Sequence, residues 1–526
     1  MKRTWMAVLL IPLALGALLW MRPPDGHDAY FHSVYAVEQV RAWHEGAVFP
    51  RYHRAWNGGT GTFVPTIYAP IPLAVQGGLA WLVGDGQRAV GLSLALALLT
   101  TGFALVRWGG TAFAVVIMVA PYVVAVSLAR ATTTEAWALA GAAVVLPLAL
   151  PQAPAMTRSR GLALALGVLL IAGSQVGMLI ELGWLLAIAW AVSLGVVWKE
   201  SEGQLPATVR ACGGVVGWAT AGFMAGAVFW LPAVVDGRYL EMRDFLGGAF
   251  DWRNNFLPDA SRMGLFLTVT ASSLLVIALV VFLRRERPPR YVLGAVIAAG
   301  VFFSTPLATP LWHLPKMENL QFPWRFLGPA TLAAVLAVAH LAGRWKATAT
   351  IVLLVPLTLL PVNLGTATDS VPTSSSPEEL ARIGQRQWGL VPTLPTTSGL
   401  YSTGFHRLGS LARLAGQSAQ VDAVERDALG GVWRVTTEEP TTVLLPLQWW
   451  PEWRIEADGK PIAYSNQWGL VAVEEETGTV EVRASLAPSR SRIAGLVLSA
   501  VGCLALVGLF LAWTGGWESI IVRDAT

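Results

Sequence analysis

The sequence predicts a polytopic α-helical membrane protein with about 12 transmembrane helices and a β-sandwich outside the membrane, just before the last helix. Hydrophobic residues make up 54% of the 526 residues and charged residues only 13%, whereas a soluble domain carries about 25% charged residues. Residues 263–283 and 493–513 contain no charge, and each is long enough to cross a bilayer, which takes roughly 20 apolar residues.

The N-terminal segment 4–21 is expected to be a retained first helix rather than a cleaved signal peptide, because no small-residue cleavage pattern follows it. The other expected spans are 88–106, 111–129, 134–150, 161–175, 176–197, 211–231, 263–283, 290–305, 325–343, 346–362 and 491–513. The apolar stretch 66–84 contains two prolines and two adjacent glycines, which disfavour a straight helix.

The distribution of basic residues in short loops indicates whether 66–84 crosses the membrane. The loops with Arg107, with Arg158 and Arg160, with Lys199 and Arg210, with Arg284, Arg285, Arg287 and Arg290, and with Arg344 and Lys346 all face the cytoplasm only if it does not cross. The positive-inside rule therefore predicts a re-entrant or interfacial segment on the outer side, with both termini in the cytoplasm. The sequence pI of about 9.2 reflects this topology, and no nucleic-acid partner is expected.

The chain divides into three expected parts: a transmembrane module, 1–362, with a first outer loop at 22–84 that contains interfacial helices; an extracytoplasmic β-rich domain, 363–490; and the last transmembrane helix with a cytoplasmic tail, 491–526. The β-domain begins with the linker TATDSVPTSSSPEEL and continues with alternating runs such as GVWRVTTEE, TTVLLPL and GTVEVRAS. The stretch ADGK, 457–460, predicts a hairpin turn. Cys212 and Cys503 lie in apolar stretches, and they imply neither a disulfide framework nor a thiolate metal site.

The first outer loop carries the first candidate site. Residues 28–45 predict a helix that ends at Gly46. Asp28, His32, Tyr35 and Gln39 share one face, and Phe31, Val34, Val37 and Trp43 lie on the rest, as in an amphipathic helix on a membrane surface. Asp28 or Asp25 could be a general base or a ligand of a divalent cation. Alternatively, either aspartate only caps the helix and His32 is only solvated.

Ionisable residues at the outer ends of other spans are further candidates. Arg130 and Glu135 lie at the end of one span and Glu181 lies a turn inside another, where charges are costly and often functional. A structural ion pair of Arg130 with Glu135 or Glu181 is an alternative of at least equal weight. Arg325, in QFPWRF, could bind a lipid phosphate, or it could anchor the helix at the interface together with Trp324. The glycine-rich NGGTGT, 57–62, lacks the lysine of a phosphate-binding loop and predicts a turn.

Several motifs occur together in one order: HDAYFH, GAVFPRY, GGTGTFVPTIYAPIP, ARATTTEAWAL, FWLPA, LQFPWRF and LPLQWWPEWRIEADGK. In this order the chain resembles the bacterial membrane proteins named 6-pyruvoyl-tetrahydropterin synthase-related. Those proteins are similar to the C-type glycosyltransferase (GT-C) superfamily, and nothing in the sequence indicates pterin chemistry. The resemblance extends over nearly the whole chain, and it implies a GT-C-like fold in a bacterial inner (cytoplasmic) membrane.

The resemblance also implies roles for individual residues. Asp28, or Asp25, would hold the first acidic position, Glu135 the second, and Arg325 the phosphate of the lipid. His32, Tyr68, Arg130, Glu181 and Trp324 would be further substrate contacts. A divalent metal, Mg²⁺ or Mn²⁺, would have Asp28, His32 and Glu135 as possible ligands. The chain departs from related sequences by having Ser174-Gln175 where Ser-His is common and a glutamate at the second acidic position, so metal dependence does not follow.

The function expected from these residues is transfer of a sugar, with inversion, from a polyprenyl-phosphate-linked donor to an extracytoplasmic glycan, lipid or protein acceptor. Asp28 is the candidate base. This function requires Asp28 and Glu135 to converge on a cavity at one water-facing membrane surface. Two alternatives remain open: a transporter or flippase for a lipid-linked glycan, against which the lack of an internal repeat counts, and a non-enzymatic envelope protein that binds glycan.

Overall fold

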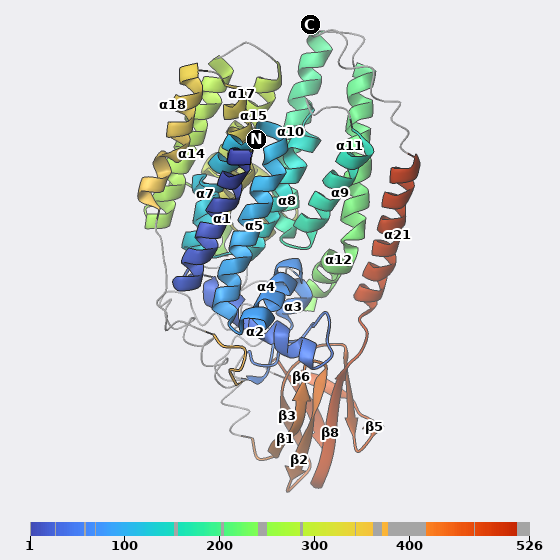
Figure 1. Ribbon diagram of the computed structural model, residues 1–526. Helices are drawn as coiled ribbons and strands as arrows, with labels where there is room; N and C mark the ends of the chain where they lie inside the picture. Colours follow the sequence, from blue (N-terminus) through green and yellow to red (C-terminus); the bar gives the residue numbers. More distant parts are fainter. Residues whose placement is uncertain are drawn as a thin grey trace.

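The chain forms a bundle of helices with a β-domain at one end (Figure 1). The structure is a computed structural model, and it describes residues 2–26, 28–56, 59–68, 70–151, 156–200, 205–239, 250–283, 288–341, 343–360, 371–376, 417–467 and 469–512. The basic loop around Arg285, most of the predicted linker at 366–380 and the tail after residue 512 lie outside the described residues.

The helices are well distributed along the chain. Those of the first half are α1 (Lys2–Met21), α2 (Ala29–His44), α3 (Val64–Ile67), α4 (Pro70–Val83), α5 (Gly86–Gly109), α6 (Thr111–Met118), α7 (Pro121–Val124), the π-helix η2 (Ala125–Arg130), α8 (Thr133–Ala149), α9 (Arg158–Ala172), α10 (Val176–Glu200), α11 (Leu205–Ala225) and α12 (Ala227–Asp236). Those that follow are α14 (Arg262–Leu283), α15 (Pro288–Phe303), α16 (Thr309–Trp312), α17 (Leu327–His340), α18 (Gly343–Leu354) and α21 (Arg490–Ala512). The short 3₁₀ turns are η3 (Gly237–Tyr239), η5 (Trp252–Asn254), η6 (Pro306–Ala308), η7 (Glu318–Leu320), η8 (Pro323–Phe326) and η9 (Val355–Leu359).

Many of these helices are apolar enough for a membrane. Within the described residues, four are long enough to cross one alone: Gly86–Val106, Val176–Gly195, Arg262–Leu283 and Arg490–Ala512. Three bent helix pairs, with bends of 53°, 70° and 89°, raise that number to seven if each pair is one span. The fold is therefore mostly helical and typical of a membrane protein, and the larger number of about 12 spans stays a prediction.

Two predicted spans are broken rather than straight. The range 111–129 divides into α6 and α7, which meet at 53°, because Pro121 cannot continue the preceding helix. The range 211–231 divides at Gly226 into α11 and α12, which meet at 70°. The stretch 66–84 is also divided, into α3 and α4, and α4 packs against α2 and α5. Pro70 and Pro72 lie in the first turn of α4, where proline is tolerated.

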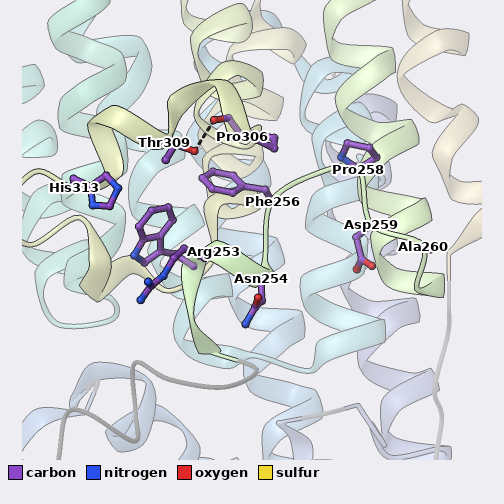
Figure 2. A pocket seen from close by; sticks show the side chains of 10 residues that line it. Arg253, Asn254, Phe256, Pro258, Asp259, Ala260, Pro306, Thr309 and His313 are labelled. Atoms are coloured by element: carbon purple, nitrogen blue, oxygen red, sulfur yellow. Dashed lines mark hydrogen bonds between the residues drawn. The ribbon is translucent and has the colours of Figure 1, made fainter.

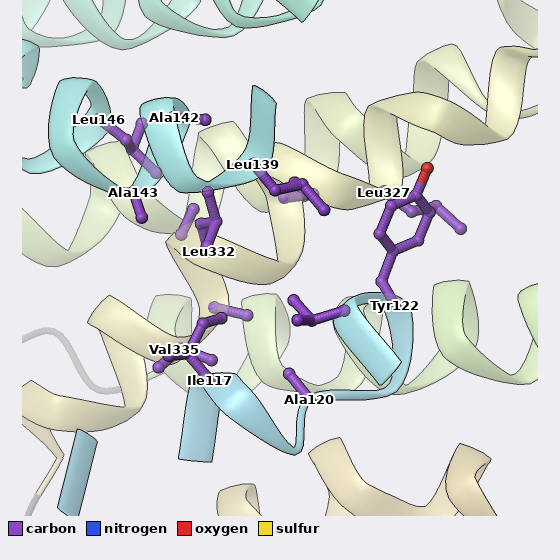
Figure 3. Close-up of a cluster of buried hydrophobic side chains, with 14 of the residues drawn as sticks. Ile117, Ala120, Tyr122, Leu139, Ala142, Ala143, Leu146, Leu327, Leu332 and Val335 are labelled. Carbon is purple, nitrogen blue, oxygen red and sulfur yellow. The ribbon is translucent and has the colours of Figure 1, made fainter. Parts of the chain in front are cut away.

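The core of the bundle packs small residues against branched ones. Ala142 and Ala143 of α8 lie near Leu332 and Val335 of α17, and Ile117 of α6 joins them (Figure 3). All five are buried. Small side chains let neighbouring helices approach closely, which is how helices associate in membranes.

The helix α2 differs from its prediction. It begins one residue after Asp28 and ends at His44, close to the predicted bounds. However, it does not lie on a surface, because its polar face is buried too: His32, Glu38 and Gln39 are at most 3% exposed. The reason is that α4 and α5 pack against α2; Figure 1 shows α2, α3 and α4 between the helix bundle and the β-domain. The prediction of an amphipathic surface helix was wrong on this point.

The β-domain is a pair of antiparallel sheets. Its strands are β1 (Gln420–Asp427), β2 (Gly430–Thr437), β3 (Thr441–Gln448), β4 (Trp453–Ala457), β5 (Lys460–Pro461), β6 (Tyr464–Gln467), β7 (Leu470–Glu475) and β8 (Gly478–Leu486). Within the described residues one sheet has the order β1-β2-β8-β4-β5 and the other β3-β7-β6. The predicted hairpin turn joins β4 to β5, with Asp458 and Gly459 at φ of 47° and 76°, as in a type I′ turn.

The first outer loop enters the core of this domain. Tyr52 and Phe63 are fully buried, and the Phe63 ring stacks on Trp450 with centroids 4.3 Å apart. The backbone N–H of Phe63 donates to the Gln448 side chain at 3.0 Å. Gly61, at φ 85°, lies so close to the Tyr52 ring that a Cβ would be 2.1 Å from it, so the described part of the motif, 59–62, is tightly packed. Tyr52 and Phe63 thus tie the first outer loop to the β-domain.

Candidate active site

Asp28 lies at the N-terminus of α2 and does not cap it. Its side chain makes no capping hydrogen bond to the helix. Instead, the Asp28 carboxylate accepts a hydrogen bond from Thr132 Oγ1 at 2.5 Å and lies 3.6 Å from Arg130 Nη2. The side chain is 25% exposed. The capping alternative therefore does not describe Asp28, whose carboxylate is directed toward the turn before α8.

Arg130 occupies an irregular piece of backbone. It ends the π-helix η2, and Ala131 follows in the left-handed region at φ 56°. Such backbone is costly for a residue other than glycine, and π-turns and strained residues occur often at functional sites. Gly26 lies against this turn, where a Cβ would be 2.6 Å from the Arg130 carbonyl carbon. The Asp28 N–H donates to the Arg130 carbonyl at 3.0 Å, which fixes α2 against the turn.

Glu135 is the buried partner of Arg130. It lies in the first turn of α8 and is 0% exposed. One carboxylate oxygen accepts from Arg130 Nη1, and the other accepts from the Tyr122 hydroxyl at 2.5 Å. Arg130 therefore contacts both predicted carboxylates, and it brings Asp28 and Glu135 together from distant parts of the chain.

Arg325 approaches the same group from the other half of the bundle. Its Nε lies 3.8 Å from the same Glu135 oxygen that accepts from Arg130, and its Nη1 donates to the Leu320 carbonyl at 3.0 Å. That Nε is buried and has no hydrogen-bond partner among the described residues. The neighbouring Trp324 ring lies under the Arg130 guanidinium at 4.8 Å. We call Asp28, Arg130, Glu135 and Arg325 the charge cluster.

Glu181 is the fifth ionisable residue in this region. It is 0% exposed and interacts electrostatically with Arg325, Glu135 and Arg130. Neither carboxylate oxygen has a hydrogen-bond partner in the described part of the chain. The predicted ion pair of Arg130 thus forms with Glu135 and not with Glu181.

His32 and Tyr68 lie next to the charge cluster. His32 is one turn after Asp28 on α2 and is 0% exposed, so it is not solvated. Burial lowers the pKa of His32 to about 4, which makes the ring neutral near pH 7. Its Nδ1 lies 3.2 Å from Thr133 Oγ1, and its ring centroid lies 5.9 Å from that of Tyr68.

The predicted metal ligands do not form a ready site. Both Glu135 oxygens are engaged by Tyr122 and Arg130, and a guanidinium next to Asp28 competes with a cation for that carboxylate. Among the described residues, no group of three His, Cys, Asp or Glu side chains is placed to hold a metal ion. Asp25 is exposed and lies on the short segment before α2. Which aspartate holds the first acidic position stays a prediction, and Asp28 is the one seen in contact with Arg130.

A surface hollow of about 570 Å³ is lined by other residues (Figure 2). Trp252, Arg253, Phe256, Asp259 and His313 are among its lining, on the loops at the ends of α14 and α15. None of the predicted site residues lines it. The hollow is thus not the cavity that was expected between Asp28 and Glu135.

Sequence reasoning missed the residues that hold the candidates in place. Thr132 and Thr133 bind Asp28 and His32, and Gln76 of α4 donates to Thr133 Oγ1. Tyr122 binds Glu135. A run of three threonines directly before Glu135 was the available signal, because hydroxyls are unusual in number at the end of an apolar span.

No protein-family model and no curated protein sequence matches this chain, so its family resemblance stays a prediction. Two solved structures are similar to part of it. The crystal structure of ArnT from Cupriavidus metallidurans bound to undecaprenyl phosphate is 16% identical over 65% of this chain, with a TM-score of 0.42. The structure of the arabinofuranosyltransferase AftD from mycobacteria is 18% identical over 68% of this chain, also with a TM-score of 0.42. The matches span 62% of the ArnT chain and 27% of the AftD chain.

Proposed function

We propose that this chain is a membrane glycosyltransferase that moves a sugar from a polyprenyl-phosphate-linked donor to a hydroxyl of an extracytoplasmic acceptor. The observation that carries the proposal is the direction of Asp28: its partly exposed carboxylate leaves its own helix and joins Arg130, beside Glu135 and Arg325. The donor class is taken from the resemblance of the ordered motifs. The charge cluster supplies two carboxylates and two guanidinium groups at the end of an apolar helix bundle.

In the proposed reaction, Asp28 removes the proton of the acceptor hydroxyl as that oxygen attacks C1 of the sugar. The bond between C1 and the phosphate oxygen breaks, and its electron pair leaves with the polyprenyl phosphate. Attack on the face opposite the leaving group inverts C1. Arg325, whose Nε has no hydrogen-bond partner among the described residues, would stabilise the phosphate charge, because guanidinium groups bind phosphate oxygens well.

The other residues of the cluster hold this arrangement. Glu135 neutralises and orients Arg130, and Thr132 orients Asp28. No step is assigned to a metal, because the three predicted ligands are not arranged as a set. Trp324 lies under Arg130, which limits the positions that the guanidinium can adopt.

Transfer of a labelled sugar from polyprenyl phosphate in isolated membranes tests the proposal. We expect Asp28→Asn to lower turnover about 10²–10⁴-fold, the usual value of a general base, with unchanged expression and thermal unfolding. Asp422→Asn, on exposed β1, is the matched control. Full activity of Asp28→Asn would reject this base, and an equal loss in Asp25→Asn alone would transfer the role to Asp25.

A further inference from the structure

Two side chains near the charge cluster are joined through a single hydroxyl. Thr133 Oγ1, on α8, accepts a hydrogen bond from Gln76 Nε2 of α4 and lies 3.2 Å from His32 Nδ1 of α2. All three residues are completely buried. Three helices therefore meet at this hydroxyl, next to Asp28.

The far ends of both side chains are unsatisfied. His32 Nε2 and Gln76 Oε1 are buried and have no hydrogen-bond partner among the described residues. Buried polar atoms without partners cost folding free energy. An apolar residue of similar size would avoid that cost at either position, so the two unsatisfied atoms are better explained by a ligand that hydrogen-bonds to them.

The hydrogen-bond roles define what kind of group fits. Because Gln76 donates to the Thr133 oxygen, the Thr133 hydroxyl proton is available to His32 Nδ1, and His32 Nε2 then carries the ring proton. The two unsatisfied atoms thus offer a ligand one donor, His32 Nε2–H, and one acceptor, Gln76 Oε1. Reversing the Gln76 amide exchanges both roles and again leaves one donor and one acceptor. Hydroxyl groups match such a pair because each can donate and accept.

The surroundings suit a sugar ring. The His32 N–H donates to the Asp28 carbonyl at 3.0 Å, so Nε2 belongs to the turn that follows the candidate base. The half-buried Tyr68 ring lies 5.9 Å from the His32 ring, and aromatic rings line many small-molecule sites with a few placed polar groups.

We propose that His32, Gln76 and Thr133 form a hydroxyl-binding subsite that holds a sugar ring beside Asp28. The subsite rests on the proposed function for the class of its ligand and deepens it by naming how the sugar is recognised. Hydroxyls of the donor sugar and of an acceptor sugar offer the same chemistry, so the experiment must separate the two sources.

The test measures binding to the purified full-length protein in nanodiscs by tryptophan fluorescence. Methyl glucoside, mannoside and galactoside represent an acceptor sugar, and undecaprenyl phosphoglucose and phosphomannose represent a donor. Undecaprenyl phosphate without sugar is the control ligand. We expect Thr133→Val to weaken binding of at least one sugar probe about tenfold or more, as loss of buried hydrogen bonds predicts, and to bind undecaprenyl phosphate like the wild type. Thr134→Val, one residue further on α8, is the matched control variant.

A second measurement distinguishes a role of Gln76 in ligand binding from a purely structural role. If Gln76 is kept for a ligand, Gln76→Leu should leave the melting temperature of the ligand-free protein unchanged or higher, while sugar binding is lost. A lower melting temperature with sugar affinity retained would overturn the subsite, as would equal affinity of every sugar probe for Thr133→Val and wild type. If Asp28→Asn transfers sugar normally while Thr133→Val has lost sugar binding, the proposed base fails and the subsite stands.

Discussion

At the residue scale, Arg130 joins two carboxylates that are 107 positions apart in the chain, Asp28 and Glu135. The two contacts differ in burial, because Asp28 is 25% exposed and Glu135 is 0% exposed. Removal of one partner from a buried ion pair is very costly, because it leaves a lone charge in the protein interior. The contact between Arg130 and Glu135 therefore contributes mainly to stability. The contact between Arg130 and Asp28 leaves the Asp28 carboxylate within reach of a substrate.

Arg130→Met should destabilise the protein strongly. Glu135 would lose the cation on one of its oxygens while it stays buried, and loss of one partner of a buried pair costs about 3–5 kcal/mol. Denaturant titration in mild detergent measures the change, and Glu135→Gln in the same chain should recover part of it. Arg253→Met, which removes a 69% exposed arginine paired with Asp251, should cost at most about 1 kcal/mol. A similar loss of stability in both arginine variants would contradict the assignment of Arg130 to a buried ion pair with Glu135.

His53 should make the free energy of unfolding depend on pH. It is 1% exposed, both ring nitrogens lack a partner among the described residues, and burial lowers its pKa to about 3. Between pH 6.5 and about 3 the unfolded chain binds a proton that the folded chain does not, so stability falls as pH falls through this window. His53→Phe, which can stack on the neighbouring Tyr35, should flatten that decline without loss at pH 7.5.

Thermal unfolding from pH 4.5 to 7.5 checks this expectation. The exposed His313→Gln is the control and should leave the pH profile unchanged. An identical acid decline in wild type and His53→Phe would show that other groups, His32 among them, account for all of it.

At the scale of elements, the start of α2 and the turn after η2 form one unit. Gly26 allows this contact because a Cβ would lie 2.6 Å from the Arg130 carbonyl carbon and 2.8 Å from the Ala129 oxygen. These are backbone atoms, which cannot move aside as a flexible side chain could. Gly26→Ala should therefore displace Asp28 from Thr132 and Arg130, and lower both the melting temperature and the rate of sugar transfer.

Gly78→Ala is the matched control, because it adds a methyl group on α4 where nothing lies within 4 Å. Alanine favours helix over glycine by about 1 kcal/mol, so this variant should be neutral or slightly stabilising. A Gly26→Ala protein with normal transfer would show that the close approach is not needed for the site.

The sequence predicted local elements well and their contacts poorly. Strand alternation and ADGK predicted β2, β3, β8 and the β4–β5 turn, since period and turn chemistry are local. The bends at Pro121 and Gly226 were missed because apolar composition continues through them. Burial of α2 on both faces was missed for a different reason: α4 and α5 pack against it, and the residue pattern of one helix does not show which later helices will cover its polar face.

The same distinction applies to the site. The sequence alone identified the charge cluster, Asp28, Arg130, Glu135 and Arg325. Charges are rare at the ends of apolar helices, so they are easily recognised in a sequence. Gln76 was not identified, because a single neutral polar residue is ordinary in an apolar stretch, and the threonine run that contains Thr133 does not show by itself which hydroxyl binds which side chain. Only the meeting of α2, α4 and α8 shows that one hydroxyl joins His32 to Gln76.

At the scale of the whole molecule, the two ends of the bundle differ. The N-terminus lies at the end opposite the β-domain, and α21 leads from the β-domain back along the bundle (Figure 1). The charge cluster lies near the start of α2, at the end that carries the β-domain. The positive-inside rule predicts that this end faces outward, which the proposed reaction with an extracytoplasmic acceptor requires.

Cysteine labelling tests this orientation. In a chain whose Cys212 and Cys503 are replaced by alanine, Ser465→Cys marks exposed β6 and Ser159→Cys marks the exposed start of α9. In right-side-out vesicles of a bacterial host, a membrane-impermeant maleimide should label Ser465→Cys at once and Ser159→Cys only after the membrane is opened. The reverse pattern would mean that the whole chain is inserted in the opposite orientation, because Asp28 contacts Arg130 and so lies on the same side of the membrane. The β-domain and the charge cluster would then face the cytoplasm, and an acceptor outside the cell could not reach Asp28.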